Sequence, residues 1–154
     1  MKRYLLDSNT VSYLHDSKSP FCQAVKKRAE NISDQDEISI SILTVYEHCY
    51  GIAKATDYND TDLINKVKNT YSMMLDSFTI ISLSVEGAEE FGKLKNEYRI
   101  DQKKDLQKKL KVDTVDLMMA GTAIAKNAIF VSNDKIFGEI KKMRPDFLLE
   151  DWTK

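Results

Sequence analysis

The sequence predicts an α/β fold with three layers, in which a central parallel sheet of about five strands carries helices on both faces. Short apolar runs alternate along the chain with longer stretches of helical periodicity, which is the pattern of consecutive βαβ units. Gly and Pro are scarce, with 5 and 2 residues among 154, so few residues are available for long loops. This length corresponds to about one domain, and we expect residues 1–154 to form a single domain.

Each predicted strand is a short apolar run that stops at polar or turn-forming residues. Residues 4–6 form the first run, which ends at Asp7 and leads into a helix. Residues 38–42 alternate Ile with Ser, and a period of two is typical of a strand. The other predicted strands cover residues 78–81, 128–131 and 147–149.

The predicted helices lie between these strands, where apolar residues recur at spacings of three and four. Thr44 and Glu47 have the spacing of a capping box, which predicts that a helix opens at Thr44. Residues 117–125 form the clearest pattern, the apolar face of a well-buried helix with small residues that allow close packing. The remaining predicted helices cover residues 21–30, 61–78, 85–98 and 135–140.

The composition is that of a globular protein, with 42% apolar residues, 31% charged residues and a net charge of −1. No apolar run approaches the roughly 18 residues that cross a bilayer, so we expect no membrane association. Asp7 interrupts the first apolar run and removes its likeness to an export signal, which makes the cytoplasm the expected location. The two cysteines, Cys22 and Cys49, are too few for a disulfide scaffold and lack metal-ligand spacing.

Four acidic residues follow predicted strands or open predicted helices: Asp7, Glu47, Asp116 and Asp134. Because the carboxyl ends of parallel strands share one edge, where ligands bind, we expect these side chains to lie together. Two carboxylates about 4 Å apart repel by roughly 4 kcal/mol at an effective dielectric near 20, so the group requires added protons or a bound cation. Hard oxygen ligands suit Mg²⁺ or Mn²⁺ better than zinc. Each acid also has a purely structural interpretation, as a helix cap or as a charge that favours a helix dipole.

Four segments resemble, in order, the motifs of PIN-domain nucleases. Residues 5–9 are similar to an apolar strand that runs into an Asp-Thr-Asn-like turn, and residues 47–51 to an acid followed four residues later by Gly. Residues 116–120 resemble an Asp before an Ala-rich helix, and residues 129–137 a strand followed by a hydroxyl residue, Asn and Asp. Residues 148–152 are similar to the closing strand of VapC-type toxins, so the resemblance spans nearly the whole chain.

The chain departs from the family pattern at a few positions. Ser8 and Ser132 stand where Thr is common, which keeps the hydroxyl group, and His48 stands where the residue after the acid is usually apolar. The chain is also longer than compact members of the toxin group, with additions around residues 56–70 and 99–111.

The resemblance implies a metal-dependent endoribonuclease, in which the bound ion positions and helps to deprotonate the water that attacks the phosphorus. It implies that the four acids, Asp7, Glu47, Asp116 and Asp134, hold one or two Mg²⁺ or Mn²⁺ ions. Asn9 and Ser132 are then candidates for orienting the carboxylates or the water. Asp113 is a reserve acid, in case its helix begins earlier. The VapC likeness further implies the toxin of a type II toxin–antitoxin pair, with a small antitoxin as partner, RNA as substrate and a homodimeric assembly.

A lysine-rich segment over residues 93–111 leads to Asp116. Such a segment is a candidate for contacts with RNA phosphates, which add salt-sensitive affinity and little sequence preference. An ordinary solvated helix and loop is the alternative interpretation. The candidate RNA-binding residues are Arg99, Lys103, Lys104, Lys108, Lys109 and Lys111.

Two other functions compete with the nuclease. Residues 5–11 are also similar to the motif of haloacid-dehalogenase phosphatases, in which Asp7 would be the nucleophile, but that family expects a second Asp where Asn9 stands. A non-catalytic PIN-like module that binds RNA without a metal is the other alternative, and the presence of all four acids argues against it.

Overall fold

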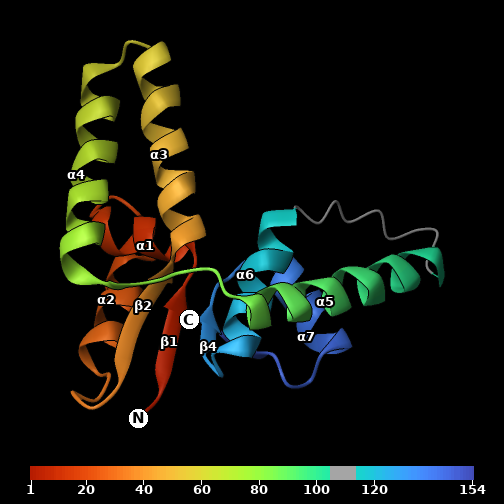
Figure 1. The fold of residues 1–154 in the computed structure, drawn as a ribbon. Coiled ribbons are helices and arrows are strands. Elements are labelled where there is room, and N and C mark those ends of the chain that lie inside the picture. Colours follow the sequence, from red (N-terminus) through yellow and green to blue (C-terminus); the bar gives the residue numbers. More distant parts are fainter. Residues whose placement is uncertain (105–113) are drawn as a thin grey trace.

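A computed structural model describes residues 1–104 and 114–154, and it has the three-layer α/β/α arrangement that the sequence predicts (Figure 1). Five strands form one sheet in the order β3-β2-β1-β4-β5, and every neighbouring pair is parallel. The strands are β1 (Arg3–Leu6), β2 (Glu37–Ser41), β3 (Thr79–Ile81), β4 (Ile129–Val131) and β5 (Leu148–Glu150). Each of them lies within about one residue of its predicted run, which confirms the fold class.

Helices cover both faces of the sheet. They are α1 (Ser8–His15), α2 (Cys22–Glu30), α3 (Ile42–Asp57), α4 (Thr61–Ser77), α5 (Val85–Lys104), α6 (Thr114–Ala125) and α7 (Lys135–Met143). In Figure 1, α1 and α2 lie on one side of the sheet and α5, α6 and α7 on the other, while α3 and α4 form a long hairpin that projects beyond both layers. None of the helices within the described ranges combines the length and the apolar character that a bilayer span requires.

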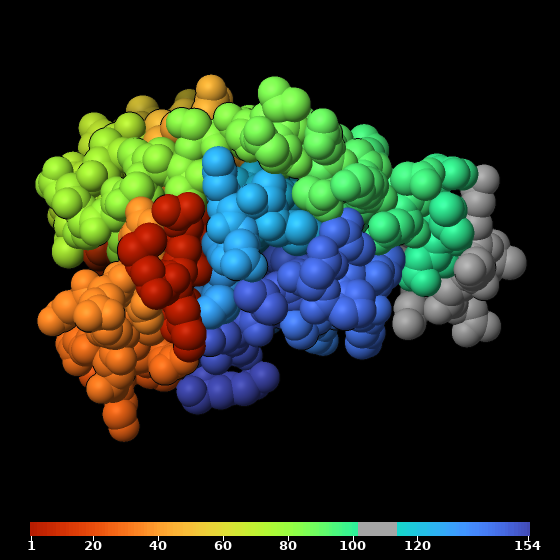
Figure 2. Space-filling view, turned by 60° about the horizontal axis from the view of Figure 1, so that its bottom comes forward, coloured from red at the N-terminus to blue at the C-terminus, as the bar shows by residue number. Residues whose placement is uncertain are grey.

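Two hydrophobic cores lie on opposite faces of the sheet because successive side chains of a strand point to opposite faces. Tyr4 and Leu6 of β1 belong to one core, whereas Leu5 belongs to the other. Trp152 closes the first core by packing on Tyr4, with ring centroids 5.5 Å apart. Figure 2 shows the result on the surface: the first residues, in red, lie beside the last residues, in dark blue.

Helices α5 and α6 pack with their backbones in direct contact. Gly121 of α6 makes this possible, since an added Cβ would lie 2.8 Å from both the Gly87 carbonyl oxygen and the Phe91 nitrogen of α5. The small residues predicted on this helix therefore do allow close packing, and they fix the position of α6 beneath α5.

Several predicted helix boundaries were wrong. Helix α3 begins at Ile42 rather than at Thr44, because the Ser41 hydroxyl at the end of β2 caps it by accepting a hydrogen bond from the Leu43 N–H at 3.1 Å. Thr44 is buried inside the helix, and Glu47 lies in the second turn instead of completing a capping box. Helices α5 and α7 continue to Lys104 and Met143, six and three residues beyond their predicted ends.

Candidate active site

The four acids singled out in the sequence line one small pocket at the carboxyl ends of the central strands. Asp7 directly follows β1, Asp134 follows β4, Asp116 lies in the first turn of α6, and Glu47 projects from α3. The pocket, which we call the acid pocket, has a volume of about 140 Å³. Its lining residues are Asp7, Ser8, Asn9, Glu47, Asp116, Met119, Asp134 and Phe137.

Asp7 is held in place by two hydrogen bonds. Its Oδ1 accepts from the Thr10 N–H at 2.6 Å, which caps α1, and its Oδ2 accepts from the Ser132 hydroxyl at 2.5 Å. The residue is only 3% exposed, and this burial raises the pKa of the Asp7 carboxyl above its ordinary value. The negative charge of Asp134 adds to the increase, while the hydrogen bonds from Ser132 and Thr10 act in the opposite direction.

Ser132 connects two of the acids. Its hydroxyl donates to Asp7 and accepts a hydrogen bond from the Asp134 N–H at 3.1 Å. Asp134 in turn caps α7, since its Oδ1 accepts from the Ile136 N–H at 3.2 Å. The end of β4 is thereby fixed against the end of β1, and the two carboxylates are held at the same edge of the sheet.

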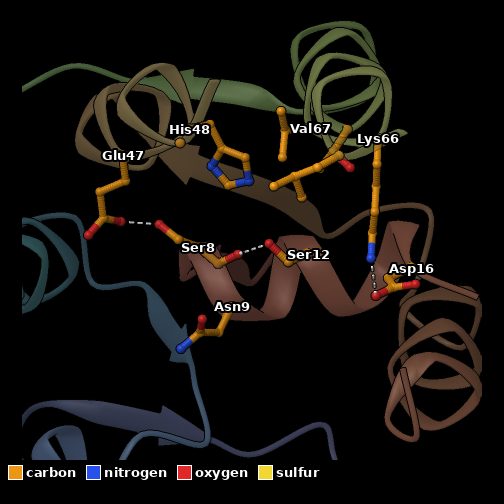
Figure 3. Close-up of a pocket in the computed structure, with 11 residues that line it drawn as sticks. Ser8, Asn9, Ser12, Asp16, Glu47, His48, Lys66 and Val67 are labelled. Atoms are coloured by element: carbon orange, nitrogen blue, oxygen red, sulfur yellow. Dashed lines mark hydrogen bonds and ion pairs between the residues drawn. The ribbon is translucent and has the colours of Figure 1, made fainter. Parts of the chain in front are cut away.

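Glu47 and Asp116 complete the acidic wall from the other two segments. The Ser8 hydroxyl donates a hydrogen bond to Glu47, which joins α1 to α3 (Figure 3). Asp116 occupies the first turn of α6, where the helix dipole favours a negative charge. Asn9 is exposed and lines the pocket beside them, whereas Asp113 lies outside the described residues.

The interpretation of these acids as helix caps or as charges that favour a helix dipole is correct for some of them, but not for Glu47. Asp7 and Asp134 are helix caps, as that interpretation expected, and they line the pocket as well. Glu47 has no capping role because α3 is capped by Ser41. Helix capping therefore gives no reason for an acid at position 47.

The chemistry of the lining residues fits a hard divalent cation, because four carboxylates converge on the acid pocket and no basic side chain is among the described residues that line it. The side chains as they stand are not arranged as a complete site: across residues 1–104 and 114–154, no group of three His, Cys, Asp or Glu could hold a metal ion. Hydrogen bonds from Thr10, Ser132 and Ser8 currently occupy oxygens of Asp7 and Glu47.

Only part of the predicted basic segment can be placed. Arg99 is exposed on α5 and donates a hydrogen bond to the Asn96 side-chain oxygen at 3.0 Å. Lys103 and Lys104 belong to the last turn of α5. The other candidates, Lys108, Lys109 and Lys111, lie outside the described residues.

Sequence reasoning missed a second, larger pocket beside the acid pocket. It lies between α1, α3 and α4, has a volume of about 330 Å³, and shares Ser8, Asn9 and Glu47 with the acid pocket (Figure 3). We call it the side pocket. Its further lining residues are Ser12, Asp16, His48, Gly51, Leu63, Lys66, Val67 and Thr70. Gly51 inside α3 is the sequence feature at this pocket, but a glycine alone does not predict a pocket.

The chain is similar in sequence to known proteins. A family model described as PIN domain matches residues 4–143. The chain is 28% identical over 151 residues to Ribonuclease VapC2 from Rickettsia felis, and the match covers 98% of both proteins.

Solved structures give a similar result. The crystal structure of VapBC2 from Rickettsia felis bound to a DNA fragment from their promoter matches with a TM-score of 0.74 and 25% identity, over 97% of this chain and 98% of that one. VapBC-1 from nontypeable Haemophilus influenzae matches with a TM-score of 0.71 and 18% identity over 99% of each chain, a likeness of fold.

Proposed function

The chain belongs to the PIN-domain family, and on that premise we propose that it is an endoribonuclease of the VapC type, the toxin of a toxin–antitoxin pair. The observation that carries the proposal is the convergence of Asp7, Glu47, Asp116 and Asp134 on the acid pocket from four separate segments. Two of these acids also cap helices, but capping alone needs no common pocket. The family match also removes the basis for a phosphatase with an Asp7 nucleophile.

The four acids would hold Mg²⁺ or Mn²⁺, on the strength of their hard oxygen donors. When bound, such an ion supplies a water of lowered pKa and positive charge beside the scissile phosphate. The protein's own contribution is orientation. Ser132 and the Thr10 N–H hold the Asp7 carboxylate, and Ser8 holds Glu47, which keeps both carboxylates at the wall of the acid pocket.

We also propose the partners of this activity. Proteins similar to this chain are solved as VapBC assemblies, and one of them is bound to promoter DNA, which supports a small antitoxin as the partner of this chain. RNA is the substrate, and the exposed Arg99 with the neighbouring Lys103 and Lys104 is a candidate surface for its phosphates. The likeness to a VapC protein also supports a homodimer, which we propose for this chain.

Cleavage of RNA by purified protein tests the function. Asp7→Asn and Asp116→Asn should each reduce the cleavage rate at least about 100-fold, because each removes a charge from the proposed cation site. Asp34→Asn is the matched control, since Asp34 is an exposed acid that precedes β2 at the opposite edge of the sheet. An Asp7→Asn protein that cleaves as fast as the parent contradicts the proposal.

Metal removal tests the cofactor separately. The parent protein should lose RNA cleavage in EDTA and regain it with excess Mg²⁺ or Mn²⁺, while its circular dichroism spectrum stays unchanged. Binding of RNA without cleavage under every metal condition would instead identify a non-catalytic module. Mapping of RNA ends after brief expression, in parent and Asp7→Asn cells, then identifies the target.

A further inference from the structure

The side pocket has the size and position of a subsite for the substrate. Its volume of about 330 Å³ is within the ~300–1,000 Å³ range of small-molecule pockets, whereas the acid pocket has less than half that volume. Ser8, Asn9 and Glu47 line both pockets and thus form the wall between them. A group in the side pocket therefore lies next to whatever occupies the acid pocket.

Gly51 keeps the side pocket open. A glycine inside a helix costs about 0.5–1 kcal/mol relative to alanine. Close helix packing requires glycine at position 121, whereas an added Cβ at Gly51, as at Gly92 and Gly138, would meet no atom within 4 Å. Of these three open glycines, Gly51 is the one that lines the side pocket. What the missing side chain provides at position 51 is free space in the pocket, one turn along α3 from Glu47.

His48 presents a hydrogen-bond acceptor to the same space. Its Nδ1 lies 3.0 Å from the Thr44 carbonyl oxygen, and since a carbonyl only accepts, Nδ1 carries the proton. In the neutral ring Nε2 is then an acceptor, and among the described residues no hydrogen bond to it is formed. Figure 3 shows the His48 ring of α3 and Val67 of α4 on the same side of the pocket, facing Ser8 and Ser12 of α1.

The charges of the pocket favour a neutral group over a phosphate. Glu47 stands at one end, and Asp16 pairs with Lys66 at 2.7 Å at the other, so the lining contains two acids and one base. The hydrogen bond from Lys66 lowers the pKa of Asp16 and keeps this carboxylate ionised. A phosphate would meet net repulsion here, whereas a nucleobase is neutral and can pack on Leu63 and Val67.

We propose that the side pocket binds the base of the RNA nucleotide next to the bond that is cut in the acid pocket. His48 Nε2 accepts a hydrogen bond from the edge of that base, which selects bases that present an N–H group there. Gly51 leaves the room for the base. The inference rests on the proposed nuclease function, and it adds the residues that determine which nucleotide flanks the cut.

A filled pocket provides the main test. Gly51→Leu places a side chain in open space of the pocket, and Gly92→Leu is the matched control because it also adds a side chain to an exposed interior position of a helix, with no atom within 4 Å of the new Cβ. Short RNAs that vary only in the nucleotide beside the cut are the substrates. Gly51→Leu should lower kcat/KM at least about tenfold, mainly through KM, and Gly92→Leu should leave it unchanged.

An abasic substrate separates base binding from damage to the acid pocket. RNA that lacks the base beside the cut should be cleaved at the same rate by the parent and by Gly51→Leu, because such RNA places no base in the side pocket. His48→Ala should reduce the preference among the four bases about fivefold, the value of one hydrogen bond, and leave cleavage of the abasic RNA unchanged.

Three results would overturn the proposal. Gly51→Leu could cleave every RNA with the parent's rate and preference, or it could be equally impaired on normal and abasic RNA. It could also lose affinity only for the antitoxin, which would make the pocket a receptor for a protein side chain.

If the parent cleaves no RNA, the proposed function is contradicted, and nucleotide binding to the side pocket is then the remaining test of the base site. Titration of the full-length protein with AMP, GMP, CMP and UMP should then shift the His48 ring signals in NMR spectra of the parent and not of Gly51→Leu. The absence of such shifts in the parent overturns the base site as well.

Discussion

Asp7 combines a structural and a proposed catalytic role in one buried carboxyl group. It caps α1, accepts a hydrogen bond from Ser132 and lines the acid pocket. Burial raises its pKa, with a contribution from the charge of Asp134. A raised pKa means that the folded protein holds this proton more tightly than the unfolded chain does. The stabilising contribution of Asp7 is therefore largest at acidic pH, and it decreases as the pH rises from the ordinary value of 3.8 through the folded value.

Substitution of Asp7 in metal-free protein tests how the raised pKa of this residue changes stability with pH. Asp7→Asn should raise the free energy of unfolding at neutral pH, because the amide caps the helix without placing a charge in a buried site. The gain should shrink as the pH falls toward the ordinary pKa of an aspartate. Asp7→Ala, which loses the cap, should cost about 1 kcal/mol relative to Asp7→Asn at every pH. Urea unfolding in EDTA gives the free energy of unfolding of the parent, Asp7→Asn and Asp7→Ala. A stability gain of Asp7→Asn that grows toward acidic pH would show that burial does not raise the pKa of Asp7.

The sequence allowed the acids to be identified but not their hydrogen-bond partners. Asp7 and Asp134 were recognisable because each follows an apolar strand and precedes a helix. The bonds to Asp7 from Ser132 and to Glu47 from Ser8 join residues 125 and 39 positions apart, so they depend on the finished fold.

At the scale of single helices, replacing the glycine of α3 or of α6 by alanine should change the stability of the protein in opposite directions. Gly51→Ala should stabilise the protein by about 0.5–1 kcal/mol, since the new methyl group meets open space and the unfolded chain loses freedom. Gly121→Ala should destabilise it by about 1–3 kcal/mol, because the methyl group would force α6 away from the backbone of α5. Thermal unfolding of both variants measures the difference, and stabilisation by Gly121→Ala would mean that α5 and α6 separate easily.

The helices and strands were predictable because their periodicity is local. The start of α3 was not, because two hydroxyl residues compete to cap it: Thr44 has the better sequence pattern, but Ser41 stands where β2 ends and caps the helix first. The side pocket was also beyond the sequence, because it depends on the placement of α4 opposite α3.

For the whole molecule, we propose that both cores unfold together as one domain. They share the sheet, since Leu5 belongs to one core and its neighbours Tyr4 and Leu6 to the other. Trp152, the single tryptophan, is 2% exposed and reports on the core that contains Tyr4 and Leu6. Urea unfolding followed by Trp152 fluorescence and by circular dichroism should therefore give the same midpoint. Two separate midpoints would show that the faces of the sheet unfold independently.

The helix starts around the acid pocket have an electrostatic consequence. Asp7 and Asp134 cap the starts of α1 and α7, and Asp116 lies in the first turn of α6. Each helix start carries a partial positive charge of roughly half an elementary charge, from peptide dipoles that need no ion. The backbone thus offsets part of the mutual repulsion of the acids from the moment the chain folds. Folding can then be completed in the absence of a cation, and only the proposed nuclease activity would require that the ion be supplied.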